Sequence, residues 1–275
     1  MKIKLFLLML LCLMVSGAIY FNPSRGRTLL GEKISQGPRL KIMTWNVGYA
    51  DLYGDSKAHI EDMRKVASVI LGEEPDVVAL QELADTRQLN VLVSHLGGKY
   101  RAQLGSRGNT DRMVALLVKF QEAEFEDVPT DIGRRALAAR FKLSEQSPEI
   151  IVISAHADAF SSHKRRVYTG NVVDWAQSHD GPVFIAGDFN FEINIDKQPS
   201  LFTDNAKNDS EAYSYLLRYF RDLGKRAGAT AANDRRIDYI FGSNDRVNLW
   251  NARVLTGAVT GKMDHRPLVV EVSVV

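Results

Sequence analysis

Polar residues recur where apolar stretches of this chain end, and their types suit one kind of chemistry. The positions are Asn46, Glu82, His156, Asp188, Asn190, Asp238, Asp264 and His265. Carboxylate and amide oxygens are the ligands that Mg²⁺ and Mn²⁺ prefer in proteins. Metal-assisted attack of water on a phosphate ester needs a metal, a base, a cation at the phosphate and an acid for the leaving group. The set contains a residue type suited to each of these parts.

Taken singly, most of these residues have an ordinary structural explanation. Asparagine and Gly-Asp runs are typical of turns, and a lone acid such as Glu82 is more often solvated than functional. Asp238 is different, because the stretch 237–241 around it is otherwise apolar. An ionised carboxylate is almost never buried without a partner. We therefore expect a histidine beside Asp238, either His156 or His265.

Composition excludes several other classes of protein. Only one cysteine, Cys12, is present among the 275 residues, which excludes an internal disulfide and a multi-thiolate zinc site. Hydrophobic residues make up 45% of the chain and charged residues 25%, as in an ordinary globular protein that can bury a core. With 35 basic and 33 acidic residues, the net charge of +2 is too balanced to indicate a nucleic-acid binder.

Residues 1–21 resemble a targeting segment. Lys2 and Lys4 precede an uncharged run over 5–21 that contains the small residues Ser16 and Ala18, a pattern typical of a signal peptide. The run is also just long enough for a membrane anchor. We expect export, with the protein periplasmic or secreted if the segment is cleaved, and attached to the membrane with its catalytic domain outside the cytoplasm if it is retained. Residues 22–38 are predicted to be a linker, and residues 39–275 a single domain.

The elements that must position these residues alternate between strands and helices. Apolar positions at helical spacing predict helices over 60–71, 89–96, 163–177 and 212–220. Apolar runs predict strands over 40–45, 76–80, 113–119, 125–128, 136–143, 150–155, 183–186, 236–241, 247–255 and 267–274. The three strands between 113 and 143 have no helix between them, which suggests a meander. This mixture favours an α/β sandwich over a doubly wound sheet.

Six short segments carry a resemblance to a known family. In chain order they are 44–46 (TWN), 78–82 (VALQE), 154–156 (SAH), 186–190 (AGDFN), 235–241 (RRIDYIF) and 264–267 (DHRP). Together they resemble the endonuclease/exonuclease/phosphatase superfamily, which has the deoxyribonuclease I-like fold. The resemblance implies a four-layered α/β sandwich, in which two packed mixed β-sheets are flanked by helices. It also implies an enzyme that hydrolyses phosphoesters with the help of a metal.

The resemblance implies a metal side of the site. Glu82 corresponds to the main metal ligand, and Asn46 and Asp264 also lie on the metal side, with Mg²⁺ or Mn²⁺ as the expected cofactor. Gly48 stands where some members carry a further acid, so a single metal is expected. Arg112 or Asp111 is a candidate for contacting the phosphate or orienting a histidine.

The resemblance also implies a catalytic side. Asp188 and Asn190 correspond to the pair that positions or activates the attacking water. His265 corresponds to the histidine at the scissile phosphate, oriented by Asp238. His156 corresponds to a second phosphate-contacting group on the leaving-group side. Whether Asp188 or His265 takes the proton of the water stays open.

The substrate is left open by the shared motifs, which fix the reaction class and not the leaving group. We expect a monomeric phosphodiesterase, with a nuclease, a lipid phosphoesterase and a non-catalytic surface binding module as alternatives. A nuclease would use basic segments, for which the candidates are 134–135, 163–166, 225–226 and 235–236, although Arg165 and Arg166 are expected to be solvated. A lipid phosphoesterase would expose aromatic residues near the site, and Phe160 and Phe191 are the candidates.

Overall fold

A computed structural model describes residues 37–48, 60–108, 112–130, 133–193, 203–258 and 262–275. All of these residues except Gly37 belong to one unit, Pro38–Val275. The targeting segment over 1–21, almost all of the expected linker and Asp111 lie outside the described residues. Among the described helices, none is long and apolar enough to cross a membrane.

The first of two six-stranded sheets has the strand order β11-β12-β1-β2-β4-β3. Its strands are β1 (Arg39–Asn46), β2 (Val77–Leu83), β3 (Arg101–Leu104), β4 (Met113–Val118), β11 (Val247–Val254) and β12 (Leu268–Val274). Strands β1 and β2 are parallel, and the other neighbours are antiparallel, so the sheet is mixed.

The second sheet has the order β5-β6-β7-β8-β10-β9. Its strands are β5 (Glu124–Val128), β6 (Ala136–Phe141), β7 (Ile150–His156), β8 (Val183–Asp188), β9 (Phe220–Asp222) and β10 (Asp238–Ser243). Only β7 and β8 are parallel to each other in this sheet.

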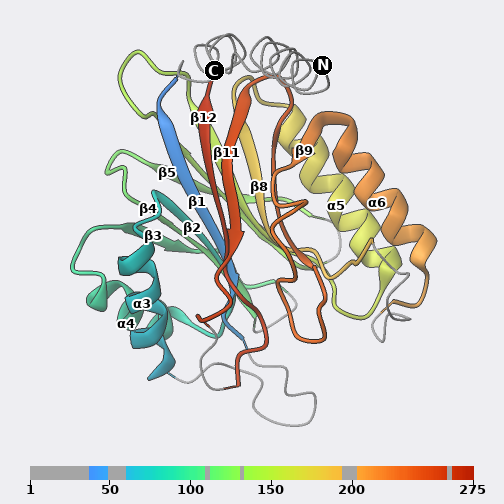
Figure 1. The fold of residues 1–275 in the computed structure, drawn as a ribbon, viewed down its shortest axis with the longest axis horizontal. Helices are drawn as coiled ribbons and strands as arrows, with labels where there is room; N and C mark the ends of the chain where they lie inside the picture. The colour runs from blue at the N-terminus through green and yellow to red at the C-terminus, as the bar shows by residue number, and fades with distance from the viewer. Residues whose placement is uncertain (1–36, 49–59, 109–111, 131–132, 194–202, 259–261) are drawn as a thin grey trace, which may run out of the picture. The chain divides into compact units, whose positions relative to one another are not determined.

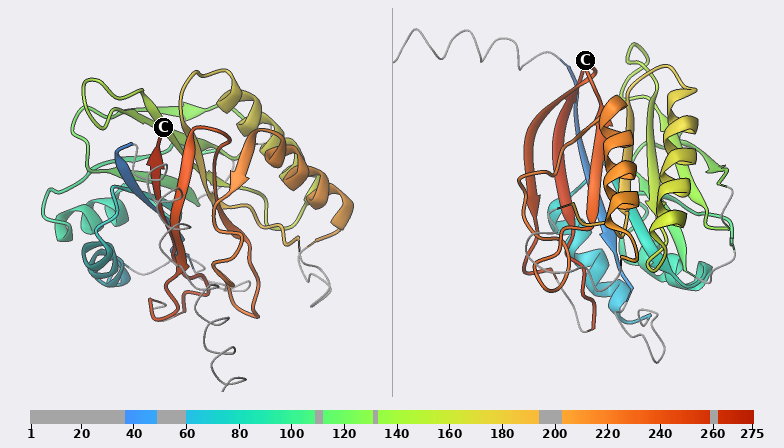
Figure 2. Two further views of the ribbon diagram at one scale, coloured as in Figure 1. Left: turned by 45° about the horizontal axis from the view of Figure 1, so that its top comes forward. Right: turned by 90° about the vertical axis from the view of Figure 1, so that its right-hand side faces the viewer.

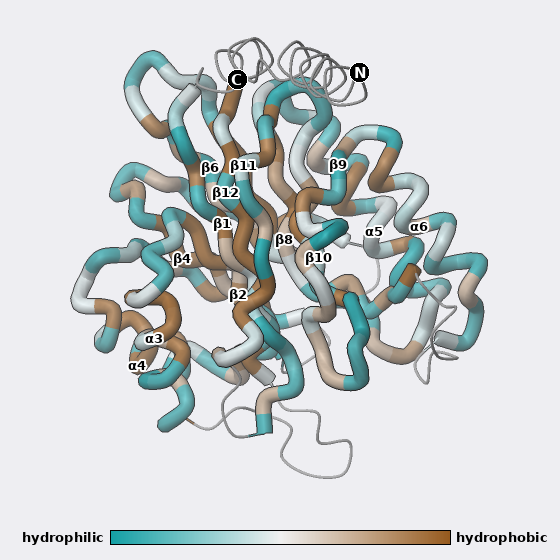
Figure 3. Tube along the Cα trace, in the orientation of Figure 1, coloured by the Kyte–Doolittle hydropathy of each residue, from teal (hydrophilic) through white to brown (hydrophobic). Residues whose placement is uncertain are grey.

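The two sheets pack face to face, and helices cover their outer faces (Figure 1). Helices α3 (Asp62–Glu73) and α4 (Thr86–His95) pack on the first sheet, and α5 (Ser162–Gln177) and α6 (Ala206–Tyr219) pack on the second. Both views of Figure 2 show α5 and α6 running alongside each other. Three buried apolar clusters fill the spaces between these layers, and the strands carry the longest hydrophobic stretches (Figure 3). The four-layered sandwich expected from the sequence is confirmed.

The meander predicted over 113–143 is wrong. Strand β4 pairs with β2 and β3 in the first sheet, whereas β5 and β6 join β7 in the second sheet. The chain therefore crosses between the sheets in the short segment that joins Val118 to Glu124. Strands of both sheets bury a face in the same central core, so their apolar patterns do not reveal which sheet each one joins.

Other elements differ from the prediction at their ends. Short strands β3 and β9 were not predicted, and helix α6 begins at Ala206, six residues earlier than expected, because its first turns are polar. Two strands next to site residues start later than expected. Strand β10 begins at Asp238, and β12 begins at Leu268, so that Asp264 and His265 lie in the loop that precedes it.

Candidate active site

Strand register brings most of the predicted residues to one edge of the two sheets. In the parallel pair β1–β2, Asn46 lies opposite Gln81, and in the parallel pair β7–β8, His156 lies opposite Asp188. Parallel strands end at the same edge, so both pairs present their carboxyl ends there. Strand β10 runs antiparallel to β8, and its first residue, Asp238, lies opposite Asp188.

A buried polar contact ties the two sheets together next to this edge. The Gln81 amide donates to the hydroxyl of Thr44 on β1 and to the hydroxyl of Ser154 on β7, each at 3.2 Å. The Ser154 hydroxyl in turn donates to the carbonyl oxygen of Leu80 at 3.1 Å. Hydrogen bonds between buried polar groups fix the geometry of the groups that share them. The ends of β1, β2 and β7 are therefore held in register with one another.

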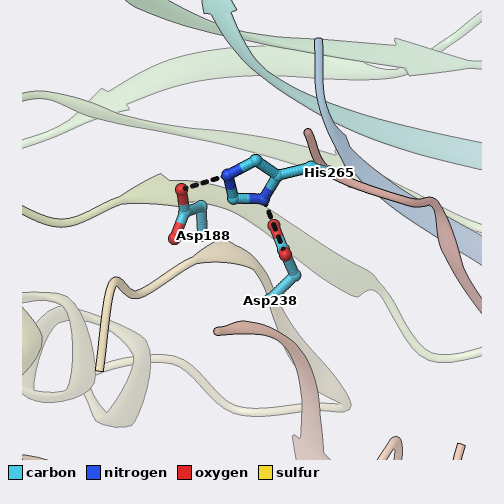
Figure 4. Close-up of side chains that lie close together, drawn as sticks. All are labelled: Asp188, Asp238 and His265. Carbon is cyan, nitrogen blue, oxygen red and sulfur yellow. Dashed lines mark hydrogen bonds and ion pairs between the residues drawn. The ribbon is translucent and has the colours of Figure 1, made fainter. Parts of the chain in front are cut away.

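The predicted histidine partner of Asp238 is His265 (Figure 4). Nδ1 of His265 lies 2.9 Å from Oδ2 of Asp238, and Nε2 on the other side of the ring lies 3.8 Å from Oδ2 of Asp188. All three side chains are buried, and Asp264 is farther away, with Oδ1 at 4.0 Å from Nε2 of His265. The imidazole is therefore oriented by Asp238 and directs Nε2 toward Asp188.

The loop before β10 holds His265 in this position. Ala231 and His265 form an isolated antiparallel bridge, and the carbonyl oxygen of Asp264 accepts a hydrogen bond from the backbone of Ala232. The hydroxyl of Thr230 accepts from the backbone N–H groups of both Ile237 and Asp238. The same short loop thus contacts the segment that carries His265 and the start of the strand that carries Asp238.

The surroundings shift the pKa values of this group. Burial raises the pKa of Asp188 to about 7, and the nearby carboxylate of Asp238 adds to the rise. Burial alone would lower the pKa of His265, but the carboxylates of Asp238 and Asp188 outweigh it and raise that pKa to about 10. These surroundings therefore favour the protonated form of His265 and make Asp188 a better proton acceptor than an ordinary aspartate.

Two asparagines hold the carboxylate of Asp188. Nδ2 of Asn46 donates to Oδ2 at 2.9 Å, and the backbone N–H of Asn190 donates to Oδ1 at 2.8 Å. Asn190 has a φ of 53°, a left-handed conformation that asparagine tolerates better than most residues. The contact from Asn46 also joins the end of β1 to the end of β8 across the two sheets.

Glu82 lies in an irregular part of β2. Its φ is 64°, and the pairing of β2 with β4 shifts register between Leu80 and Leu83. Such strain and bulges are typical of residues that a fold aims into a site. Oε1 of Glu82 lies 3.0 Å from Nη1 of Arg112 and 3.6 Å from Nε2 of His156. The structure thus places Arg112, one of the two candidates in its region, beside Glu82.

Gly48 is required by the close approach of Glu82. A Cβ at position 48 would lie 2.0 Å from Oε2 of Glu82 and 2.7 Å from its Cβ. Glycine at this position therefore does more than replace a potential metal ligand. It leaves room for Glu82, which any side chain at position 48 would displace.

We expect Gly48→Ala to lower kcat by roughly tenfold to a hundredfold, since a shift of about 1 Å in a site residue can cost that much. The matched control is Gly170→Ala on α5, where an added Cβ has no neighbour within 4 Å. Steady-state kinetics of both variants, with circular dichroism to establish folding, makes the comparison. Equal activity of the two variants would mean that the position of Glu82 does not matter for turnover.

His156 lies on the opposite side of Asp188 from Asp238. Nε2 of His156 is 3.8 Å from Oδ2 of Asp188, and Nδ1 is 3.1 Å from Nη1 of Arg134. Burial lowers the pKa of His156 well below its usual value, and Arg134 and Arg112 lower it further. His156 and His265 therefore flank the same carboxylate, and their pKa values are shifted in opposite directions.

The oxygen-rich set suits a hard divalent cation. One group of potential ligand atoms, from Asp188, Asp238 and His265, lies within 4.8 Å of one another. The hydrogen bond between His265 and Asp238 already uses the facing atoms of that pair, although Oδ1 of Asp238 is buried with no hydrogen-bond partner. Glu82 and the amide oxygen of Asn46 are the alternative ligands, and they leave this pair intact. The donor chemistry fits Mg²⁺ or Mn²⁺ in either place.

Several side chains differ from their sequence-based interpretation. Arg165 is fully buried, where Nε and Nη2 bind both carboxylate oxygens of Asp209, so the expectation that it is solvated is wrong. Phe191 is also fully buried and is no candidate for an exposed lipid contact, whereas Phe160 is 66% exposed. Arg236 pairs with the buried Asp222 at 2.9 Å.

The contact between Arg134 and His156 was not predicted from the sequence. Arg134 was only a candidate for contacting nucleic-acid phosphates. Strand register gives only a general signal: Leu137 pairs with Ser154, so the residues just before β6 lie near the end of β7, where His156 stands. Which of the two arginines before β6 contacts His156 depends on tertiary structure, and the structure shows that it is Arg134.

Comparisons with known proteins identify the family and agree with the fold. The model of the endonuclease/exonuclease/phosphatase family matches residues 43–260. A solved structure from that family in Bacteroides vulgatus is 17% identical with a TM-score of 0.67, covering 86% of this chain and 100% of that one. The human Nocturnin catalytic domain with bound sulfate is 19% identical (TM-score 0.63, 86% and 94% covered), and a Bacteroides thetaiotaomicron mannosyl-6-phosphatase is 18% identical (TM-score 0.63, 85% and 99% covered).

At these identities the solved structures establish the shared fold alone, and no curated protein sequence gives a significant match. The family model covers most of the chain and contains Asn46, Glu82, His156, Asp188, Asn190 and Asp238, while Asp264 and His265 follow its end. The resemblance found in the six sequence motifs is therefore confirmed. The chain belongs to the endonuclease/exonuclease/phosphatase family, whose members are generally hydrolases that act on phosphoesters.

Proposed function

We propose that this protein is a metal-dependent phosphodiesterase that hydrolyses its substrate by in-line attack of water. The observation that carries the proposal is the buried group of Asp188, His265 and Asp238 at the sheet edge, with Asn46 bonded to Asp188. Family membership supports the reaction class. This group provides a carboxylate, Asp188, and an imidazole that Asp238 orients. The nearby acid Glu82 suits a hard cation.

Each residue has a role in this proposal. Asp188, held by the two asparagines and with its pKa raised to about 7, accepts the proton of the attacking water. The carboxylate of Asp238 favours the protonated form of His265, which suits it to donate from Nε2 to a phosphate oxygen and not to accept that proton. Asp238 keeps the ring of His265 oriented. Glu82 and Asn46, with Asp264 nearby, are the residues that would hold Mg²⁺ or Mn²⁺, which when bound neutralises charge on the phosphate and activates water.

The arginines at the site support a diester over a monoester. A terminal phosphate carries about −1.5 to −2 charges at neutral pH, whereas a diester carries one. Arg112 is paired with Glu82, and Arg134 contacts His156 and lies 3.9 Å from Asp158. Both guanidinium groups are already engaged, so little positive charge remains to neutralise the second negative charge of a monoester.

The ion pairs of three arginines favour a compact diester over duplex DNA. Three of the basic residues proposed for phosphate contacts are engaged with acids: Arg165 with Asp209, Arg236 with Asp222, and Arg235 at 3.7 Å from Glu192. Binding of duplex nucleic acid depends on several free cations that neutralise successive phosphates. We therefore expect a small phosphodiester, in which the residues at the sheet edge supply most of the contacts.

A substrate panel tests this function. We expect the purified full-length chain with Mg²⁺ or Mn²⁺ to cleave an aryl phosphodiester, and excess chelator to abolish turnover. The panel also contains plasmid and single-stranded DNA, RNA, sphingomyelin, phosphoinositides and an aryl phosphomonoester, and Asp188→Asn serves as the control for contaminating enzymes. Undiminished turnover in excess chelator would contradict the metal, and selective cleavage of the monoester, of nucleic acid or of lipid would contradict the small diester.

A further inference from the structure

The contact between Arg134 and His156 fixes the tautomer of the histidine. Nη1 of Arg134 lies 3.1 Å from Nδ1 of His156. A guanidinium has only N–H donors and no acceptor, so Nδ1 must accept this hydrogen bond through its lone pair. The single proton of a neutral imidazole is then on Nε2. An imidazolium, which carries protons on both nitrogens, is incompatible with this contact.

The Nε2–H group that results lies at the centre of the site without a partner. Nε2 is buried and has no hydrogen-bond partner among the described residues. Its nearest acceptors, Oε1 of Glu82 at 3.6 Å and Oδ2 of Asp188 at 3.8 Å, are beyond hydrogen-bond distance. A buried polar group without a partner is costly and calls for an explanation. Here the N–H lies between two carboxylates that the proposed function assigns to the metal and to the attacking water.

The backbone on both sides holds Arg134 and His156 at this distance. The hydroxyl of Tyr168 accepts from the backbone N–H of His156 at 3.0 Å and donates to the carbonyl oxygen of Arg135 at 3.5 Å. The carbonyl oxygen of Arg134 accepts a hydrogen bond from the hydroxyl of Thr130. Only 16% of the Arg134 side chain is exposed, and Nε lies 3.9 Å from Oδ2 of Asp158. The guanidinium is therefore fixed from several directions.

The two histidines of the site are thus prepared for different tasks. Nδ1 of His265 faces the carboxylate of Asp238, which favours an imidazolium, whereas Nδ1 of His156 faces a guanidinium, which forbids one. A general acid must hold a proton that it can release and regain. A neutral imidazole with a single fixed N–H is poorly suited to that exchange, but it is well suited to donate a preorganised hydrogen bond.

We propose that Arg134 is a positioning residue that holds His156 in the neutral Nε2–H tautomer, so that His156 donates a fixed hydrogen bond to a phosphate oxygen and transfers no proton. The identity of the acceptor rests on the proposed function, whereas the tautomer rests on the contact with Arg134 alone. The consequence for catalysis is that the leaving group receives no proton from His156.

Nitrogen NMR of the full-length, ¹⁵N-labelled chain tests the tautomer without any turnover. We expect the Nδ1 signal of His156 at the position of an unprotonated ring nitrogen and the Nε2 signal at that of a protonated one, with His156→Gln identifying both signals. Arg134→Met should move them toward a mixture of tautomers. Arg135→Met, which removes the neighbouring exposed arginine, should leave them unchanged. A protonated Nδ1 in the unsubstituted protein overturns the proposal even if Arg134→Met does not fold.

Kinetics with two aryl phosphodiesters tests the role. One substrate has a good leaving group, such as nitrophenolate, and the other a poor one, such as phenolate. We expect Arg134→Met to lower kcat roughly tenfold to a hundredfold by misplacing a donor, and by the same factor for both substrates. A clearly larger loss with the poor leaving group would show that His156 transfers a proton and would overturn the proposal. No turnover of either substrate by the unsubstituted protein would contradict the proposed function instead, and the NMR result would stand.

Discussion

Replacing His265 with asparagine is expected to lower kcat at least roughly a hundredfold without unfolding the protein, which is the usual cost of removing a preorganised donor. The Nδ2 group of asparagine lies about as far along the side chain as Nδ1 of histidine, so it can still donate to the buried carboxylate of Asp238. What the variant lacks is Nε2, the nitrogen that lies 3.8 Å from Asp188. The loss of activity would then report the role of the imidazolium at the phosphate and not a loss of structure.

Two further variants make this experiment decisive. His265→Ala leaves Asp238 buried without its partner, which is expected to cost about 3–5 kcal/mol of folding free energy. His163→Asn changes an exposed histidine of α5 and should keep the activity of the unsubstituted protein. The measurements are kcat with an aryl phosphodiester and the free energy of unfolding in urea. A folded His265→Asn variant with nearly unchanged kcat would place the reaction elsewhere on the molecule.

The site could be predicted from sequence to the extent that it depends on the ends of strands. Asn46, His156 and Asp188 each end an apolar strand, and the register of the parallel pairs brings such ends together. The burial of Asp238 was also predictable, because its neighbours are apolar, and so was its need for a histidine. These features are local, so a single sequence contains them.

The partners of these residues could not be predicted, because they depend on tertiary structure. The choice of His265 over His156 as the partner of Asp238 is made by the loop around Thr230 and Ala231, whose contacts are invisible in the sequence. Arg165 lies in a polar helix start, and only the packing of α5 against α6 gives it the buried partner Asp209. The place of β4 in the first sheet depends on pairings that the apolar pattern leaves undetermined.

The metal can be located by its effect on stability. We expect added Mg²⁺ or Mn²⁺ to raise the Tm of the unsubstituted protein, since a ligand at a hundred times its Kd stabilises the fold by about 2.7 kcal/mol. Glu82→Gln keeps the size of the side chain but removes the charge. This variant should lose the rise in Tm and at least roughly a hundredfold in kcat. Glu122→Gln, which changes an exposed acid outside the site, should keep both.

The same titration separates the two places where a cation would fit. If the metal binds at Glu82, Asp238→Asn should keep the metal-dependent rise in Tm, because Asp238 is occupied with orienting His265. If the metal instead binds within the group of Asp188, Asp238 and His265, Asp238→Asn should lose the rise and Glu82→Gln should keep it. That second result would contradict the assignment of Glu82. It would also occupy Nε2 of His265 with the metal, because Nδ1 is already bonded to Asp238, and the proposed role of His265 as a donor to the phosphate would fail with it.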